Sequence, residues 1–188
     1  MKPFLTLICG ALLLAGAGGA SADAYGDTTE LFKNAGESAG FFHNCYGYAV
    51  FPTVGKGGLV VGGAYGTGHV YAQGKYTGEA SITQLSVGFQ AGGEAYSQIV
   101  FFENKTAYDE FTSGSFEFGA DAGAVAITAA AGATAGTTGA SATASGGKKD
   151  AVTTGRYYKG MAVFTIVKGG AMYQAAIAGQ KFKFAPAK

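Results

Sequence analysis

Short apolar runs separated by glycine, proline or polar residues recur along most of the chain, and this pattern is typical of β-strands. The clearest alternation starts at Ser81, where Leu85, Val87 and Phe89 share one set of positions and polar residues or glycine the other. This spacing predicts a strand with one apolar face. Residues 96–102 are apolar at most positions and predict a second, more fully apolar strand. Strands are likewise predicted at residues 48–51, 59–61, 68–72, 116–118, 125–127, 161–167, 171–177 and 182–184.

Glycine and proline positions predict where these strands turn. Residues 52–58, which begin with a proline and contain three glycines, are expected to connect two short strands. Turns are also expected at residues 73–75 and at residues 168–170, the second of which would close a hairpin. In the last apolar run Lys181 and Lys183 alternate with phenylalanines, which is typical of an edge strand protected against intermolecular pairing.

Two segments show the periodicity or the end signals of helices. In residues 23–42, Asp27 and Glu30 are spaced like a capping box, ahead of apolar residues at helical spacing. We expect this helix to pack on the sheet; contact with a membrane surface is the alternative, although the helix is not basic. A short helix is expected at residues 105–113, with Asn104 as its N-cap. The apolar stripe of the first helix is Leu31, Phe32, Ala35, Ala39 and Phe42.

The composition supports one β-rich domain. The 188 residues include 33 glycines, 14 phenylalanines and 11 tyrosines, and only 13% are charged. The glycines follow no three-residue period, which excludes a collagen-like chain. Residues 129–149 are rich in alanine, glycine and threonine and form a low-complexity segment. The predicted fold is therefore α+β and mostly antiparallel β, a sandwich or barrel-like sheet with an N-terminal helix and one short internal helix.

The start of the chain has the layout of a secretory signal peptide. Lys2 precedes an apolar run at residues 4–14, and Ala20-Ser21-Ala22 follows as an A-x-A cleavage site. An uncleaved membrane anchor is the alternative, but the run is shorter than the ~20 residues that span a bilayer. Acylation at Cys9 would leave almost no leader before it. We therefore expect residues 1–22 to be removed, residues 23–188 to form the domain, and the protein to be periplasmic or otherwise associated with the cell envelope.

The residues offer little support for catalysis, metal binding or nucleotide binding. Without Lys2 the chain has 13 − 1 = 12 basic and 12 acidic residues, so bulk charge implies no nucleic-acid partner. Gly74-Lys75 is followed by tyrosine and lacks the spacing of a phosphate-binding loop. His43 and Cys45 could contribute two metal ligands, which do not make a site. After cleavage Cys45 is the only cysteine, and we expect it to be a small buried residue, with a redox role as the alternative. We expect that the protein is not an enzyme and that it uses no cofactor or metal.

Four motifs in order along residues 42–184 resemble the SYLF family of lipid-binding domains. The first is Gly47-Tyr48-Ala49-Val50-Phe51-Pro52, continued by Val54, Lys56-Gly57-Gly58 and Val61-Gly62-Gly63. The second is Ser86-Val87-Gly88-Phe89-Gln90 with Gly92-Gly93. The third is Phe111-Thr112-Ser113-Gly114 with Gly119-Ala120-Asp121-Ala122, and the fourth is Lys159-Gly160-Met161 with Gly169-Gly170.

The resemblance implies a non-enzymatic protein that binds membrane lipids. Members of the family bind phosphoinositides in eukaryotes, and a fungal branch also binds actin filaments. Residues 129–147 depart from the family, which usually has a Gly-Pro turn and charged residues after its Gly-Ala-Asp block. The predicted export also separates this chain from cytoplasmic actin and phosphoinositides. The expected partner is therefore anionic phospholipid, or another amphiphile, at the surface of the envelope membrane.

The residues expected to contact lipid are Lys33, Phe41 and Lys56. Lys56 matches a recurring lysine of the family and could meet a lipid phosphate as a point charge, or it could be a solvated turn lysine. Two other functions stay open on the sequence. One is a small outer-membrane β-barrel, which the length, the glycine and tyrosine content and the leader would fit. The other is a structural or partner-binding periplasmic domain without lipid affinity.

Overall fold

A computed structural model describes residues 22–58, 61–87, 94–118, 125–127, 157–168, 177 and 179–188. The predicted signal peptide up to residue 21, the low-complexity segment 129–149 and most of the predicted strand at residues 171–177 lie outside the described residues. The helices are α1 (Ala22–Lys33), α2 (Gly36–Ala39), α3 (Phe41–Asn44) and α4 (Lys105–Phe111). The strands are β1 (Gly47–Gly58), β2 (Val61–Ala72), β3 (Lys75–Val87), β4 (Glu94–Phe102), β5 (Phe116–Glu117), β6 (Val125–Ile127), β7 (Met161–Val167) and β8 (Gln180–Pro186).

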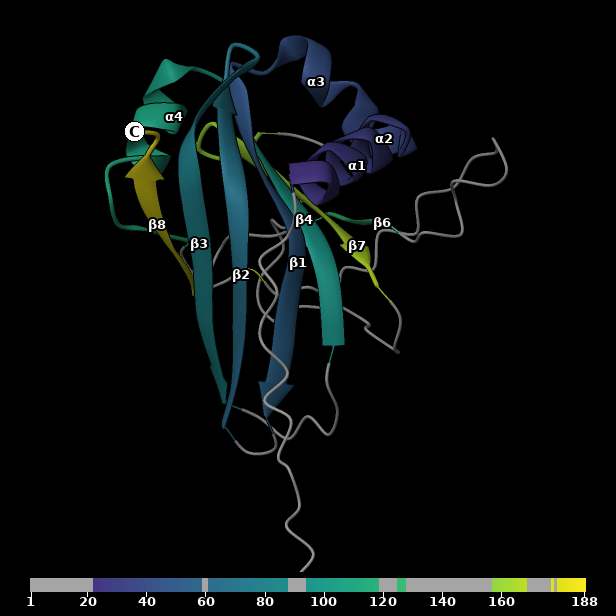
Figure 1. The fold of residues 1–188 in the computed structure, drawn as a ribbon, viewed down its shortest axis with the longest axis vertical. Coiled ribbons are helices and arrows are strands. Elements are labelled where there is room, and N and C mark those ends of the chain that lie inside the picture. The colour runs from purple at the N-terminus through teal and green to yellow at the C-terminus, as the bar shows by residue number, and fades with distance from the viewer. Residues whose placement is uncertain are drawn as a thin grey trace, which may run out of the picture.

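The strands form one sheet in the order β5-β8-β3-β2-β1-β4-β7-β6. Every pairing in it is antiparallel except that between β6 and β7, which is parallel. The predicted class, α+β and mostly antiparallel, is confirmed. Figure 1 shows α1, α2 and α3 gathered on one face of the sheet near one end of the strands, with α4 beside β8.

The sheet curls until strands far apart in its order face each other. The side chains of Gln98 on β4 and Gln180 on β8 form two amide hydrogen bonds, of 2.9 Å and 3.1 Å, although three strands separate β8 from β4. Gln180 Nε2 also donates to the Tyr96 hydroxyl oxygen at 3.0 Å. Both glutamines are fully buried, so each amide is satisfied by the other rather than by water. This contact confirms the predicted barrel-like curvature.

Two apolar clusters lie on the two faces of the sheet. The inner cluster fills the concave face, where Phe111 of α4 packs against Phe102 and Phe182, with ring centroids 4.9 Å apart in each case. The outer cluster lies between the sheet and the N-terminal helices. Its buried members are Tyr25, Phe32, Val50, Ile99, Phe101, Ala162, Phe164 and Ile166.

The expected turn at residues 52–58 is wrong, because β1 runs through it as a continuous strand. The pairing of β1 with β2 shifts register between Val50 and Thr53, and its pairing with β4 shifts between Phe51 and Val54. Pro52 lies inside both shifts, where the ladder is interrupted and its missing N–H is not required. The bulge therefore accommodates a proline that would break a regular central strand.

The alternation in β3 is present, but its buried side is the opposite of the prediction. Gln84 is only 8% exposed, whereas Leu85 is 86% exposed. Gln84 pairs with Gln180 of β8, so it enters the interior at the level of the glutamine amide pair. Because that level of the interior is already polar, a buried glutamine is compatible with it. The side chains of Val87 and Phe89 lie outside the described ones.

The predicted N-terminal helix is divided into α1, α2 and α3. Asp27 lies within α1 rather than at its N-cap, and Leu31 of the predicted stripe is exposed. The buried positions include Thr28 and Thr29, whose hydroxyls donate to the carbonyls of Ala24 and Tyr25 at 2.7 Å and 2.8 Å. Burying these threonines costs little, because each hydroxyl is satisfied within the helix.

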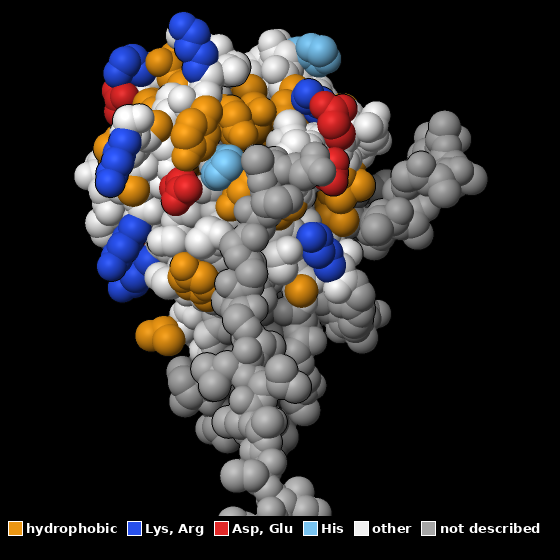
Figure 2. Space-filling view, in the orientation of Figure 1, with side chains coloured by type: hydrophobic (Ala, Val, Ile, Leu, Met, Phe, Trp, Pro, Cys, Tyr) orange, Lys and Arg blue, Asp and Glu red, His pale blue; other side chains and the backbone are white. Residues whose placement is uncertain are grey.

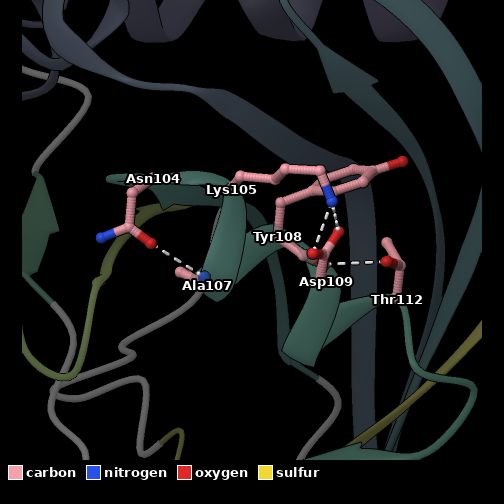
Figure 3. A network of polar contacts seen from close by, with 6 residues as sticks. All are labelled: Asn104, Lys105, Ala107, Tyr108, Asp109 and Thr112. Atoms are coloured by element: carbon pink, nitrogen blue, oxygen red, sulfur yellow. Dashed lines mark hydrogen bonds and ion pairs between the residues drawn. The ribbon is translucent and has the colours of Figure 1, made fainter.

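Helix α4 begins as predicted and ends at Phe111, two residues before the predicted end. The Asn104 side chain accepts a hydrogen bond from the Ala107 N–H at 3.0 Å, which makes it the N-cap (Figure 3). Lys105 pairs with Asp109 one turn later at 2.6 Å. Gly114 follows the helix with φ +108°, a conformation that favours glycine.

The prediction that β8 is an edge strand is wrong in the described sheet. The two-residue strand β5 pairs Phe116 and Glu117 with Phe182 and Lys181, so β8 lies between β5 and β3. Lys181 Nζ lies 3.5 Å from a Glu117 carboxylate oxygen across this pairing. A two-residue partner covers only part of a seven-residue strand, which explains why the lysine pattern resembled an edge.

Candidate functional site

A surface hollow lies where the N-terminal helices meet one end of the sheet. It has a volume of about 610 Å³ and is bordered by the end of α1, by α3, by the start of β1 and by the turn between β2 and β3. This volume is in the range of sites for small molecules. Its walls combine aromatic and polar groups, including Lys33, Phe42, Tyr46, Tyr48 and Gln73.

A tight turn fixes one wall of the hollow. Gln73 and Gly74 connect β2 to β3 with φ values of +50° and +76°, the left-handed pair that a two-residue hairpin requires. The Gln73 N–H donates to the Tyr46 carbonyl at 2.9 Å, and the Tyr46 N–H donates to the Phe102 carbonyl at 2.8 Å. The predicted turn at residues 73–75 is confirmed, and these bonds hold it against the start of β1.

Lys33 is the sequence candidate that lies in this hollow. Its ammonium is 2.7 Å from Glu30 Oε1 and 5.9 Å from the centroid of the Phe42 ring. The lysine side chain is 46% exposed, so the cation is available at the surface while it lies over the Phe42 ring. An incoming anion would compete with the Glu30 carboxylate.

The other two sequence candidates lie elsewhere. Phe41 is half-buried, and its ring centroid lies 5.5 Å, 5.1 Å and 4.9 Å from those of Phe101, Tyr157 and Phe164. It is therefore part of the outer cluster rather than the exposed aromatic that the sequence suggested. Lys56 lies within β1, in register with Ala64 and Glu94, and not in a turn. The structure does not bring the three candidates together, and their contact with lipid stays a prediction.

An aromatic row borders the helices on the outer face of the sheet. The His69 ring stacks on Tyr25 of α1, with centroids 3.5 Å apart and planes 7° from parallel. Tyr76 lies 4.9 Å from His69, and Tyr71 lies 5.9 Å from Tyr76 and 5.0 Å from Tyr48. Burial lowers the pKa of His69, and the nearby Glu79 carboxylate opposes this effect. The sequence signal for this row is His69 and Tyr71 at alternate positions before residues 73–74, with Tyr76 after them.

Large apolar side chains remain exposed among the described residues, and two of them, Leu85 and Leu31, were placed by the sequence analysis on apolar faces. Leu85 is the most exposed of them, followed by Tyr65 at 59%. Tyr158, Tyr76 and Leu31 are also exposed. Figure 2 shows orange apolar side chains and blue lysines on the outer face of the sheet. Tyrosine at such positions combines an apolar ring with a polar tip, as side chains at membrane interfaces do.

The described residues show no arrangement that favours metal or thiol chemistry. Among them no group of three or more histidine, cysteine or acidic residues could hold a metal ion. Cys45 is a half-buried free cysteine, and burial raises the pKa of its thiol, which favours the unreactive protonated form. None of the described helices combines the length and the apolar character that a transmembrane helix needs.

Comparison with known proteins assigns the family. Residues 83–183, more than half of the chain, match the model of the Ysc84 family, described as Las17-binding protein actin regulator. This range contains the second, third and fourth sequence motifs. The chain is also 29% identical over 155 residues to Beta cell expansion factor A of Aeromonas veronii. That alignment covers 81% of this chain and 51% of the relative, so the chain spans about half the relative's length. The chain belongs to the SYLF (Ysc84) domain family.

Proposed function

We propose that this protein is a non-enzymatic protein of the cell envelope that binds phospholipid at a membrane surface. The family is associated with lipid binding, which gives the class of ligand. The observation that carries the proposal is the exposure of large apolar side chains, Leu85 and Tyr65 above all, on a surface that also presents lysines. Such a surface can enter the lipid interface and attract anionic headgroups at the same time.

The predicted signal peptide supports the proposed location in the cell envelope. Lys2, the apolar run at residues 4–14 and the small residues before Asp23 direct export, and the mature chain has equal numbers of basic and acidic residues. Attraction to an anionic membrane must therefore come from local lysines and not from net charge. Each surface lysine contributes about 1 kcal/mol near an anionic leaflet, so binding is modest and weakens as salt screens it.

The test is flotation of the mature chain, residues 23–188, with vesicles of graded phosphatidylglycerol content in phosphatidylcholine. We expect flotation that rises with the anionic fraction and falls as salt is raised from about 50 to 300 mM. Lys33→Ala and Lys56→Ala test the sequence candidates. Lys105→Ala is the matched control, because Lys105, like Lys33, is an exposed helix lysine paired with an acidic residue, but it lies on α4 and does not line the hollow. Absence of flotation on every vesicle at low salt would refute lipid binding and leave a structural or partner-binding role.

A further inference from the structure

Part of the outer face of the sheet is not covered by any of the described helices and is built mainly from small side chains. Three rows of residues cross it in register from β1 to β3 or β8. All of their members are exposed or half-exposed. We call this surface the bare face, and its rows are Thr53-Thr67-Ser81-Lys183, Gly55-Tyr65-Thr83-Lys181 and Gly57-Gly63-Leu85.

Two glycines of the bare face, Gly55 and Gly57, are not required by packing. A Cβ added at Gly55 or Gly57 would meet nothing within 4 Å. On the inner face of the neighbouring strand, a Cβ at Gly68 would clash with the Phe51 ring, and one at Gly66 would lie 2.8 Å from the Thr53 carbonyl oxygen. The inner glycines are thus fixed by close contacts. The outer ones weaken the strand without relieving any clash, since glycine is a poor strand residue.

Two large side chains project from this flat surface. Leu85 is diagonal to Tyr65 across β2 and β3, because Leu85 pairs with Gly63 and Tyr65 with Thr83. The register places Leu85 in solvent even though Gln84, its polar neighbour, is buried. The residues beside both side chains include glycines, which have no side chain of their own. Leu85 and Tyr65 can therefore contact a partner that lies flat against the sheet.

The charges around the bare face favour an anionic partner. Lys181 and Lys183 lie along its β8 side, and on its other side Lys168 Nζ donates to Thr53 Oγ1 at 3.2 Å. Figure 2 shows blue side chains on both flanks of this face of the molecule. Glu117 is paired with Lys181, and Glu79 lies one row closer to α1. A second copy of the chain would bring lysine flanks together, and like charges at short range repel.

We propose that the bare face is the surface that lies against the bilayer, with Leu85 and Tyr65 entering the lipid interface and Lys168, Lys181 and Lys183 meeting its phosphates. This inference rests on the proposed lipid binding and goes further, because it assigns the contact to β1, β2, β3 and β8. It places the docking surface away from the hollow at Lys33.

The sequence contains no tryptophan, so one introduced tryptophan reports on its own position alone. We would compare Leu85→Trp with two matched controls at exposed sites elsewhere, Leu31→Trp on α1 and Tyr158→Trp before β7. Each full mature variant is mixed with phosphatidylglycerol vesicles that contain brominated acyl chains. We expect a blue shift and strong quenching at Leu85→Trp, and neither at the two controls. Quenching at Leu31→Trp without quenching at Leu85→Trp would overturn the assignment in favour of the helix side.

A charge variant provides a second readout. Lys181→Ser combined with Lys183→Ser should weaken binding to the same vesicles by about 10- to 30-fold, while Lys105→Ser leaves it unchanged. If the parent chain floats but neither Leu85→Trp nor the lysine pair responds, the bare face is not the docking surface although lipid binding stands. If the parent chain does not float, lipid binding itself fails. A chain that is dimeric in solution and becomes monomeric on Leu85→Ser would assign the face to a second copy and overturn the inference.

Discussion

The two halves of the outer face differ in the size of the side chains they carry. Where α1, α2 and α3 cover the sheet, its outward positions are Val50, Ile99, Phe101 and Phe164, all fully buried. On the bare face the outward positions are mainly glycine, serine and threonine. Large apolar side chains therefore lie where helices cover the sheet and small ones where they do not, as expected if apolar area is kept from water. Leu85 and Tyr65 depart from this rule, and the proposed contact with a bilayer would account for their exposure.

The largest effect on stability should come from truncating a buried side chain in the half of the outer face that the helices cover. Phe101 is fully buried and its ring lies 4.8 Å from that of Phe42 and 5.8 Å from that of Phe164. Phe101→Ala removes these contacts and leaves a cavity, so we expect the free energy of unfolding to fall by about 3–5 kcal/mol. Urea denaturation of the mature chain, followed by circular dichroism, measures this loss.

The matched substitution on the bare face is Leu85→Ala. Because Leu85 is almost fully exposed, we expect the free energy of unfolding to change by no more than about 0.5 kcal/mol. A loss comparable to that of Phe101→Ala would mean that Leu85 is buried within the free protein, and the contrast between the two halves would not hold.

The glycines give a second, smaller contrast. Gly68→Ala places a methyl group against Phe51 and the Val50 carbonyl, so we expect a loss of about 1–3 kcal/mol. Gly57→Ala faces open space and should be neutral or slightly stabilising, by up to about 1 kcal/mol. Thermal unfolding of both variants, compared at equal pH, measures this difference in stability. Equal destabilisation by the two would show that the outer glycines are as constrained as the inner ones.

Local signals in the sequence predicted most of the strands and the short internal helix. Asn104 and the glycine after α4 act through neighbouring backbone groups, and the turn at Gln73 and Gly74 depends on two residues in the left-handed region. Such features need no knowledge of distant partners. The alternation in β3 was visible for the same reason, since it depends only on the pleat of one strand.

Which side of a strand is buried depends on contacts that the local pattern does not contain. The interior accepts Gln84 because Gln98 of β4 and Gln180 of β8, neither of them a neighbour of Gln84 along the chain, make that level polar. Leu85 was therefore assigned to the wrong side. Pro52 was read as part of a turn because its bulge is defined by both neighbouring strands. The bare face was missed for the same reason, since its rows combine residues from four strands.

The smallest expected effect lies at the border between the two halves, where His69 stacks on Tyr25. The groups around its ring are Tyr25 of α1, Tyr71 of β2, and Tyr76 and Glu79 of β3. Burial lowers the pKa of His69 in the folded state below its usual value of 6.5, so protonation favours the unfolded chain. This contribution to stability is complete above about pH 7 and is lost as pH falls from about 6.5 through the folded-state pKa.

His69→Phe keeps a ring on Tyr25 but cannot titrate. The midpoint of urea unfolding should fall less between about pH 7.5 and pH 5 in this variant than in the parent chain. An identical fall in both would assign the pH dependence to other groups and show that the border is not sensitive to the charge on His69.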